Sequence, residues 1–388
     1  RVGHRFLDPG SSLRKLALQG LPDEAGLSRP MAEAVLDGMA KEWTTRSLLR
    51  LLHTEFEEAT VLDTFIRRRN GGRHRAFGLS PAIHVTSGNV PGVGATSLIR
   101  GLMVKSATLL KPGSDDRLLS TLFLDALSSE DPEIAAAAAV AEWDPEDASV
   151  QAGIAEAELL VVYGGDDAIR WVRTHASPNA QTVIYPHRVS AAVVMAAYAD
   201  KTLEEAAKAV AGSVALFDQR GCVSPHTVYI VVREGAVAER FAEQVGAQLA
   251  ELDQTLPPGV PQPGEASSFQ QMAGTAELES AVEEPDAPTV HGVGTRWRVV
   301  LEPRPGFRAS PSGRFVWIRP VASVEQVVDE LEPLKRQIQT LGVWGKVGAP
   351  ALERLSRLGV RRITTVERAP WPAARSRHDG IAPLRSLL

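Results

Sequence analysis

The sequence contains a single cysteine, Cys222, among its 388 residues. One thiol cannot close an intramolecular disulfide, so we expect a protein of a reducing, intracellular compartment. Long hydrophobic runs are also missing. The two longest, residues 134–141 and 191–199, reach about half of the ~20 residues that span a bilayer. No charged and then apolar leader opens the sequence. These absences predict a cytoplasmic protein with no membrane span.

A surplus of charge of one sign is absent, and aromatic residues are scarce. The 42 Lys and Arg residues face 47 Asp and Glu residues, a net charge of −5. Nucleic-acid binders carry a basic surplus, so no nucleic-acid partner is predicted. Aromatics make up 5% of the chain, and Ala, Val and Leu carry most of its 44% hydrophobic content. This composition excludes disorder, collagen and coiled coil, and is typical of α/β proteins.

Strand-like and helix-like segments alternate along most of the chain, which predicts βαβ units and mostly parallel sheets. Strands are expected at residues 82–85, 108–111, 159–163, 182–184, 227–232, 297–301, 315–318 and 362–366. The stretch 257–264 is rich in proline and is predicted to be an irregular loop.

The length predicts two or three domains at roughly 150 residues each. The segments predicted are an N-terminal helical part (1–75), a nucleotide-binding domain (76–213), a catalytic domain carrying the cysteine (214–340) and a C-terminal segment (341–388) that returns to the cofactor or oligomerisation region.

Cys222 lies among residues typical of a turn, directly before a strongly β segment. Gly221 leaves room for a ligand, and Arg220 can favour the thiolate, which is the nucleophilic form. The alternative is a buried cysteine that acts as a small hydrophobe. The residues alone leave both interpretations open.

Three further segments follow predicted strands. The Asn89 amide can donate to an oxyanion, or it can cap the next helix. Lys111 is placed for ribose or phosphate contacts, or it is a solvated loop residue. Gly164 and Gly165 can present N–H groups to a pyrophosphate, or they serve only the backbone angles of a turn. The histidines lack metal-ligand spacing, so no metal is assigned.

Taken in order, several motifs resemble one family. They are Gly-Asn-Val-Pro at 88–91, Val-Lys at 104–105, Leu-Lys at 110–111, Val-Tyr-Gly-Gly-Asp-Asp at 162–167, Tyr-Pro-His-Arg-Val-Ser at 185–190, residues 218–226, and His-Asp-Gly at 378–380. The chain resembles the LuxC-type acyl-CoA reductases, a branch of the aldehyde dehydrogenase superfamily, from about residue 16 to its end.

This resemblance implies an α/β, aldehyde-dehydrogenase-like fold with a Rossmann-type cofactor domain, an α/β catalytic domain and a small oligomerisation extension. It implies that Cys222 is the nucleophile, that Asn89 holds the oxyanion, that Lys111 contacts the adenosine ribose and that Gly164 and Gly165 meet the pyrophosphate. A homo-oligomer, a dimer or a tetramer, is expected. The roles of His187, His226 and His378 stay open.

One departure from the family, besides Pro186 where the family usually has glycine, and one further residue bear on the chemistry that the resemblance implies. Aldehyde-oxidising members carry a glutamate where residues 183–188 contain no carboxylate, so hydrolysis of an acyl-enzyme should be slow. Ser114, three residues past Lys111, stands where enzymes that prefer NAD often have a glutamate. It can donate to a 2′-phosphate, which favours NADPH over NADH. Asp115 and Asp116 act in the opposite direction, but they are expected at the start of a helix with their side chains toward solvent.

The predicted function is therefore NADPH-dependent reduction of a fatty acyl thioester, from CoA or a carrier protein, to the aldehyde through an acyl-cysteine. An acyl-transferring partner protein is compatible with it. The alternatives are a CoA-acylating aldehyde dehydrogenase that works oxidatively and a catalytically silent scaffold subunit.

Overall fold

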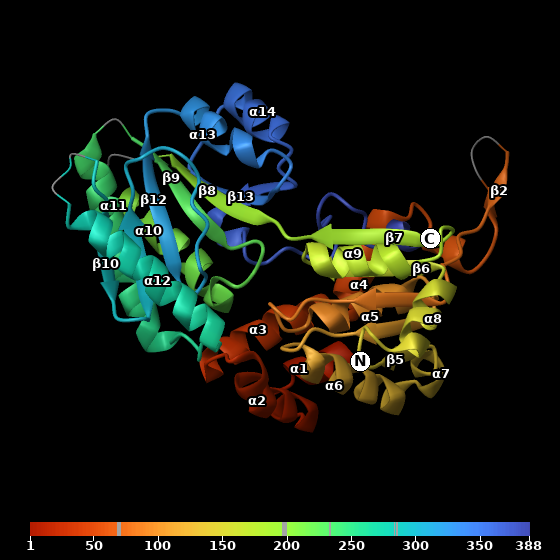
Figure 1. The fold of residues 1–388 in the computed structure, drawn as a ribbon. Coiled ribbons are helices and arrows are strands. Elements are labelled where there is room, and N and C mark those ends of the chain that lie inside the picture. Colours follow the sequence, from red (N-terminus) through yellow and green to blue (C-terminus); the bar gives the residue numbers. More distant parts are fainter. Residues whose placement is uncertain (68–70, 196–199, 233, 283, 285) are drawn as a thin grey trace. The chain divides into compact units, whose positions relative to one another are not determined.

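Two β-sheets organise the chain, one in each of two units (Figure 1). The computed structural model describes residues 1–67, 71–195, 200–232, 234–282, 284 and 286–388. The first unit comprises Arg1–Ala25, Ala32–His187 and Pro372–Leu388, and the second Gly26–Met31 and Arg188–Trp371. This division lies before the predicted boundary at 213/214, because β8 (Val189–Met195) and α10 (Asp200–Ala215) belong to the second unit.

Helices occupy the N-terminal part of the chain, as predicted. They are α1 (Val2–Leu7), α2 (Ser12–Ala25), α3 (Arg29–Glu42), α4 (Thr45–Glu55) and the 3-10 helix η1 (Ala59–Leu62). Apolar residues three to four apart along α3, among them Met31, Val35 and Leu36, are fully buried. Such spacing places them on one face of a helix. A short antiparallel pair, β1 (Ile66–Arg67) and β2 (Arg73–His74), follows.

The sheet of the first unit has five parallel strands in the order β5-β4-β3-β6-β7. The strands are β3 (Ala82–Val85), β4 (Thr108–Lys111), β5 (Ala138–Val140), β6 (Leu159–Gly164) and β7 (Gln181–Pro186). The chain starts at the central β3, moves outward to β5 and returns to β6 on the other side. This is the strand order of a Rossmann-type sheet, in which ligands bind beyond the carboxyl ends of the strands at the reversal point.

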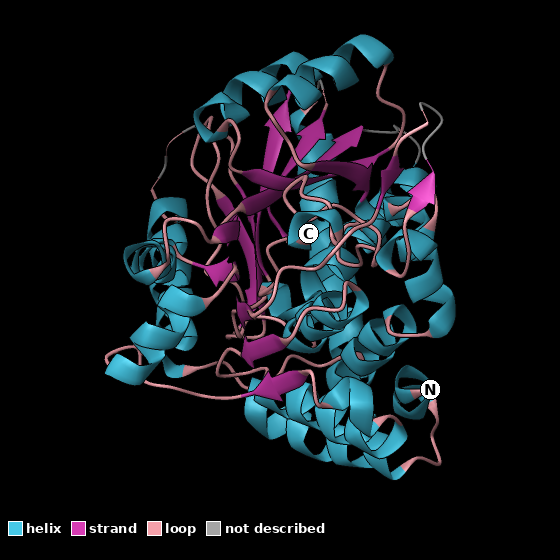
Figure 2. Ribbon diagram, turned by 90° about the vertical axis from the view of Figure 1, so that its right-hand side faces the viewer, coloured by secondary structure: helices cyan, strands magenta, loops and turns pink. Residues whose placement is uncertain are grey.

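Helices connect these strands and cover both faces of the sheet. They are α5 (Val93–Met103), α6 (Arg117–Glu130), α7 (Pro132–Ala135), α8 (Ala148–Glu156) and α9 (Asp166–His175). One core contains Ile83, Leu160 and Val162 with α8 and α9. The other joins the opposite face to α4 and to the C-terminal Leu384 and Leu387, next to η5 (Arg385–Leu387). Figure 2 colours the helices cyan and the strands magenta.

The sheet of the second unit has seven strands in the order β10-β11-β12-β9-β8-β13-β14, all parallel except for the edge strand β10. The strands not yet given are β9 (Pro225–Val231), β10 (Thr289–Val293), β11 (Trp297–Leu301), β12 (Phe315–Val321), β13 (Ile338–Trp344) and β14 (Arg362–Thr365). The central strands are apolar along almost their whole length, as expected when both faces are covered.

Helices also cover this sheet. They are α11 (Gly235–Thr255), α12 (Pro263–Ser280), α13 (Val324–Leu331) and α14 (Ala349–Arg357), with the short η2 (Leu216–Gln219), η3 (Glu332–Leu334) and η4 (Val366–Arg368). Helices α10 and α11 pack on one face, and α13 and α14 on the other. The predicted loop 257–264 is wrong at its end. Pro263 begins α12, because a proline suits the first helical turn, and Gln262 and Glu265 form a capping box there.

Among the described residues, no helix combines the length and the apolar character needed to cross a membrane.

Candidate active site

The loops that follow β3 and β4 meet backbone to backbone at the carboxyl edge of the first sheet. A Cβ on Gly113 would lie 2.1 Å from the backbone nitrogen of Gly88, and one on Gly88 would lie 2.9 Å from that of Asp115. Only glycine fits such a close approach. The contact brings the loop of Asn89 against the loop of Ser114, two of the residues predicted for the site.

Asn89 is exposed and does not cap α5. The helix begins at Val93 with Gly92 as its N-cap, at a φ of +94°. The buried carboxylate of Asp116 accepts hydrogen bonds from the Gly92 and Gly94 N–H groups at 2.5 and 2.6 Å. The alternative of Asn89 as a helix cap is therefore wrong. Burial raises the pKa of Asp116 to about 7, although both N–H groups act in the opposite direction.

One cationic side chain contacts the backbone of Ser114, and another ends the strand that precedes it. Lys111 is the last residue of β4, and its Nζ lies 5.9 Å from the centroid of the Trp143 ring. Arg117 donates from Nε to the Ser114 carbonyl at 3.0 Å, and its Nη1 pairs with Glu142 at 2.8 Å. The Ser114 hydroxyl is exposed, and the charge of the adjacent Arg117 is paired with that of Glu142.

Gly164 is the last residue of β6, and Gly165 connects it to α9. Gly165 is the N-cap of α9 with φ −75° and ψ 177°, an extended conformation that any residue adopts. The alternative that the turn needs glycine for its backbone angles is therefore wrong at Gly165. A Cβ on Gly165 would meet nothing within 4 Å, so open space borders the helix N-terminus. Asp166 and Asp167 occupy the first turn and complement the same positive end of the helix.

Aromatic rings gather beside this turn. The rings of Tyr163 and Tyr185 stack with centroids 4.3 Å apart, and the His378 ring lies 4.9 Å from that of Tyr185. Burial, followed by the charge of Tyr163, raises the pKa of Tyr185. Tyr185 therefore keeps its proton and is not a base. Tyr185 lies in the stretch 183–188, which contains no carboxylate.

In the second unit, the loop that leads to Cys222 has an unusual backbone. Phe217, Asp218 and Gln219 have φ values of 56°, 48° and 63° in succession. Such left-handed conformations cost roughly 1–3 kcal/mol each for residues other than glycine. They persist only where the surroundings over-determine them, and they cluster at functional sites.

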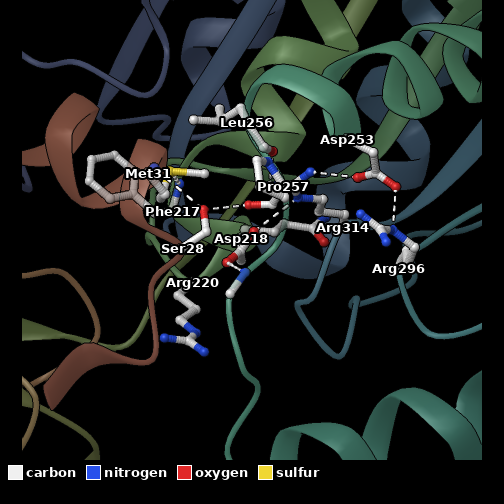
Figure 3. Close-up of polar contacts among 12 residues, drawn as sticks. Ser28, Met31, Phe217, Asp218, Arg220, Asp253, Leu256, Pro257, Arg296 and Arg314 are labelled. Carbon is white, nitrogen blue, oxygen red and sulfur yellow. Dashed lines mark hydrogen bonds and ion pairs between the residues drawn. The ribbon is translucent and has the colours of Figure 1, made fainter. Parts of the chain in front are cut away.

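Side chains from distant parts of the second unit hold this backbone (Figure 3). Asp218 pairs with the Nε of Arg314 at 2.9 Å and also accepts from the Gly259 N–H at 2.9 Å. The oxygen Oε1 of Gln219 accepts from the Phe315 N–H at 2.8 Å. Arg314 is completely buried and also binds Asp253 at 3.0 Å and the Leu256 carbonyl at 2.8 Å.

Cys222 itself is half-buried. Its carbonyl accepts a hydrogen bond of 2.6 Å from the Ser190 hydroxyl, whose oxygen accepts from the Thr340 N–H at 3.0 Å. Arg220, the cation expected to favour the thiolate, is instead engaged by Glu265 at 2.9 Å. His226 accepts at Nδ1 from the Ser310 N–H at 2.9 Å. These contacts anchor the backbone on both sides of the thiol.

Five of the six predicted site residues, namely Asn89, Lys111, Ser114, Gly164 and Gly165, lie at the carboxyl edge of the first sheet. Cys222 belongs to the second unit. Sequence reasoning missed Asp116, Arg314 and Ser190. The Asp-Asp pair at 115–116 indicates a helix start. The Asp116 carboxylate, however, accepts hydrogen bonds at the N-terminus of the preceding helix, α5. No local signal marks Arg314.

Solved structures with the same fold define the class of protein. The chain matches a crystal structure of aldehyde dehydrogenase 21 from Physcomitrella patens, with a TM-score of 0.72 and 13% identity over 100% of this chain and 83% of that one. It also matches an NAD-dependent benzaldehyde dehydrogenase from Corynebacterium glutamicum, with a TM-score of 0.70 and 14% identity over 100% and 81% of the two chains. The fold is that of the aldehyde dehydrogenases, as predicted.

A family model described as "Acyl-CoA reductase (LuxC)" matches residues 1–388. The chain belongs to this family of oxidoreductases. A relative in Aliivibrio fischeri, a long-chain acyl-protein thioester reductase, is 24% identical over 395 residues, covering 100% of this chain and 79% of that protein. The predicted family and the assignment as an acyl thioester reductase are confirmed.

Proposed function

We propose that the chain reduces a long-chain fatty acyl thioester to the free aldehyde with NADPH, through a covalent acyl–Cys222 intermediate. The observation that carries this proposal is the clamped, left-handed segment 217–219 ahead of the only cysteine. Structure that stores backbone strain next to a nucleophile is typical of a catalytic loop. The name of the Aliivibrio fischeri relative supports a long-chain acyl group and a protein-bound donor.

The proposed chemistry balances in two steps. The Cys222 thiolate attacks the thioester carbonyl, the bond to the donor sulfur breaks, and the donor leaves as a thiol after taking a proton. NADPH, when bound, supplies a hydride for the acyl carbonyl. The resulting thiohemiacetal collapses to aldehyde and restores the Cys222 thiolate. Asn89 is the proposed oxyanion donor, and loss of one such donor typically lowers turnover by ~10² to 10³-fold.

The first unit offers groups that fit a phosphorylated dinucleotide. Gly165 borders open space at the N-terminus of α9, and Lys111 ends β4, which β3 separates from β6 in the same sheet. Arg117 contacts the carbonyl of Ser114, so the Ser114 hydroxyl and a cation can share a 2′-phosphate. We expect Ser114→Glu to lower kcat/KM for NADPH by at least tenfold relative to NADH, because its carboxylate would repel the phosphate. Kinetics with both cofactors measure this ratio, and an unchanged ratio contradicts the role of Ser114.

Covalent trapping tests the nucleophile. Incubation with radiolabelled acyl-CoA should label the wild type, and Cys222→Ala should carry no label while it still binds NADPH by fluorescence titration. Ser224→Ala, two residues away and buried in the same turn, is the matched control and should label normally. Label on the alanine variant at position 222 would exclude this intermediate. A wild type that neither labels nor oxidises NADPH would favour the silent scaffold.

Hydrolysis distinguishes reduction from aldehyde oxidation. Tyr185 stays protonated, and residues 183–188 supply no carboxylate, so the acyl-enzyme should outlast a water attack. We expect little free fatty acid from acyl-CoA when no cofactor is present, and aldehyde when NADPH is added. Rapid release of free acid without NADPH would overturn this part of the proposal. His187 would then be the first residue to test as the base.

A further inference from the structure

The loop that carries Asn89 is fixed at both ends by the loop that follows β4. Near its beginning, Gly88 packs so closely on this second loop that a Cβ on Gly88 would lie 2.9 Å from the backbone nitrogen of Asp115. At its end, the Gly92 N–H donates to the carboxylate of Asp116 at 2.5 Å. Three residues separate Gly88 from Gly92, and Asn89 is one of them. The backbone that carries Asn89 is therefore short and is bounded on both sides by contacts with the same partner loop.

The Asp116 carboxylate does not cap the helix that it begins. Asp116 is the N-cap residue of α6, but its side chain accepts no capping hydrogen bond from the described residues of that helix. Glu24 caps α6 instead, because it accepts from the Leu118 N–H at 2.9 Å. The two oxygens of Asp116 accept from Gly92 and Gly94 at the N-terminus of α5, at 2.5 and 2.6 Å. Asp116 is completely buried, and a buried carboxylate is unfavourable unless such hydrogen bonds compensate it. Its hydrogen bonds are therefore directed to the Asn89 loop and to α5.

Close packing surrounds the contact between Asp116 and the end of this loop. A Cβ on Gly94 would lie 3.1 Å from Oδ2 of Asp116 and 2.4 Å from Oγ of Ser120. Gly92 has a φ of +94°, and a Cβ there would lie 2.9 Å from Cγ of Met39. Only glycine suits these two positions. The end of the loop is thus packed on one side and hydrogen-bonded on the other, so a change of the Asp116 side chain should move the loop itself.

We infer that Asp116 is a positioning residue for Asn89: its carboxylate binds the N–H groups of Gly92 and Gly94 and so fixes the loop that presents the Asn89 amide to the oxyanion. The inference rests on the proposed function, because it requires Asn89 to be the oxyanion donor. Such a donor is effective when it is held in place before the charge develops. Asn89 is exposed, so the position of its amide depends on the backbone that carries it. A cap that only stabilised α5 would affect folding and not the reaction.

The test is a double-mutant cycle on the rate at which radiolabelled acyl-CoA acylates the protein in a single turnover. The rate is measured at pH 8, above the Asp116 pKa of about 7, so that the carboxylate is ionised. Asn89→Ala should lower the maximal rate by ~10² to 10³-fold. Asp116→Asn keeps one acceptor oxygen for two N–H groups and should lower the maximal rate about tenfold or more, with little change in the half-saturating acyl-CoA concentration. The double variant should match Asn89→Ala within about twofold, because Asp116 acts through Asn89.

Glu24→Gln is the matched control. It weakens the carboxylate cap of α6 without a change at the Asn89 loop, so it should lower stability and leave the acylation rate unchanged. Should circular dichroism show that Asp116→Asn does not fold, Asp116→Ser provides a second uncharged variant, because serine is favoured at the N-cap of α6.

The outcomes separate this inference from the proposed function. A wild-type rate in the folded Asp116 variant overturns the inference, as does an equal slowing by Glu24→Gln. Losses that multiply in the double variant also overturn it, because Asp116 would then act independently of Asn89. A wild-type rate in Asn89→Ala would instead contradict the oxyanion role of Asn89 in the proposed function, and the positioning role would fall with it.

Discussion

At the scale of single residues, the Cys222 loop depends on partners that lie far away in the sequence. Phe217, Asp218 and Gln219 adopt left-handed backbone angles that short-range contacts alone would not maintain. Arg314, which is completely buried, fixes this backbone through its ion pair with Asp218. A buried arginine is tolerated because its donors meet two carboxylates and a carbonyl.

Removal of the Arg314 side chain should therefore lower the free energy of unfolding substantially. Arg314→Met leaves Asp218 buried without its cation, and we expect a loss of about 3–5 kcal/mol in the free energy of unfolding, measured with urea. Arg296→Met is the control. It removes the other partner of Asp253, but Arg296 is half exposed, so the loss should stay below about 1 kcal/mol. Equal losses in the two variants would contradict the role given to Arg314.

At the scale of elements, periodicity and β-propensity located most of the strands. The predicted strands 82–85, 108–111 and 297–301 coincide with β3, β4 and β11. Strands β5, β8, β10 and β13 were missed. Of these, β5 and β8 lie in alanine-rich runs, and alanine favours helices when it is judged residue by residue. Burial on both faces overrides that preference for Ala191 and Ala192.

Some residues of the candidate site could be predicted from the sequence, and others could not. Residues that follow predicted strands, such as Asn89 and Lys111, could be assigned from local sequence and from the resemblance to a family. Ser190 could not, because only the pairing of β8 with β9 brings its hydroxyl to the Cys222 carbonyl. Asp116 was expected at the start of its own helix, but its carboxylate caps α5 instead.

The Asp116 cap predicts a pH dependence. Burial raises the pKa of Asp116 to about 7 from an ordinary 3.8, so the folded state binds this proton more tightly than the unfolded chain. The stabilisation that this proton adds to the folded state is complete below the unfolded pKa of Asp116 and is lost as the pH rises toward 7. Asp116→Asn cannot titrate. Its deficit in unfolding free energy should therefore shrink by more than about 1 kcal/mol between pH 5 and pH 8.

Urea titrations of both proteins at the two pH values measure this difference. A deficit that grows with pH would mean that the two backbone N–H groups keep Asp116 ionised in the folded state.

At the scale of the whole molecule, each unit is assembled from segments that are not contiguous. The first unit recovers Pro372–Leu388 from the end of the chain, and the second takes Gly26–Met31 from near its beginning. Length and composition divide the chain only into consecutive segments, so they cannot predict units that are built from segments far apart in the sequence. The C-terminal segment contributes to the core of the first unit, because the buried Leu384 and Leu387 pack with residues of β6 and β7.

Separate cores predict that damage stays within one unit. Leu384→Ala leaves a cavity beside Leu159, Val161 and Val183 of the first unit, and Leu249→Ala does the same in the α10–α11 core of the second. Both leucines are fully buried, so each variant should lose about 2–5 kcal/mol of local stability. Native-state hydrogen exchange should show faster exchange in β6 and β7 for the first variant, and in β8 and β9 for the second. If either substitution accelerates exchange equally in both sheets, the two units unfold as one cooperative block, and their cores are not energetically separate.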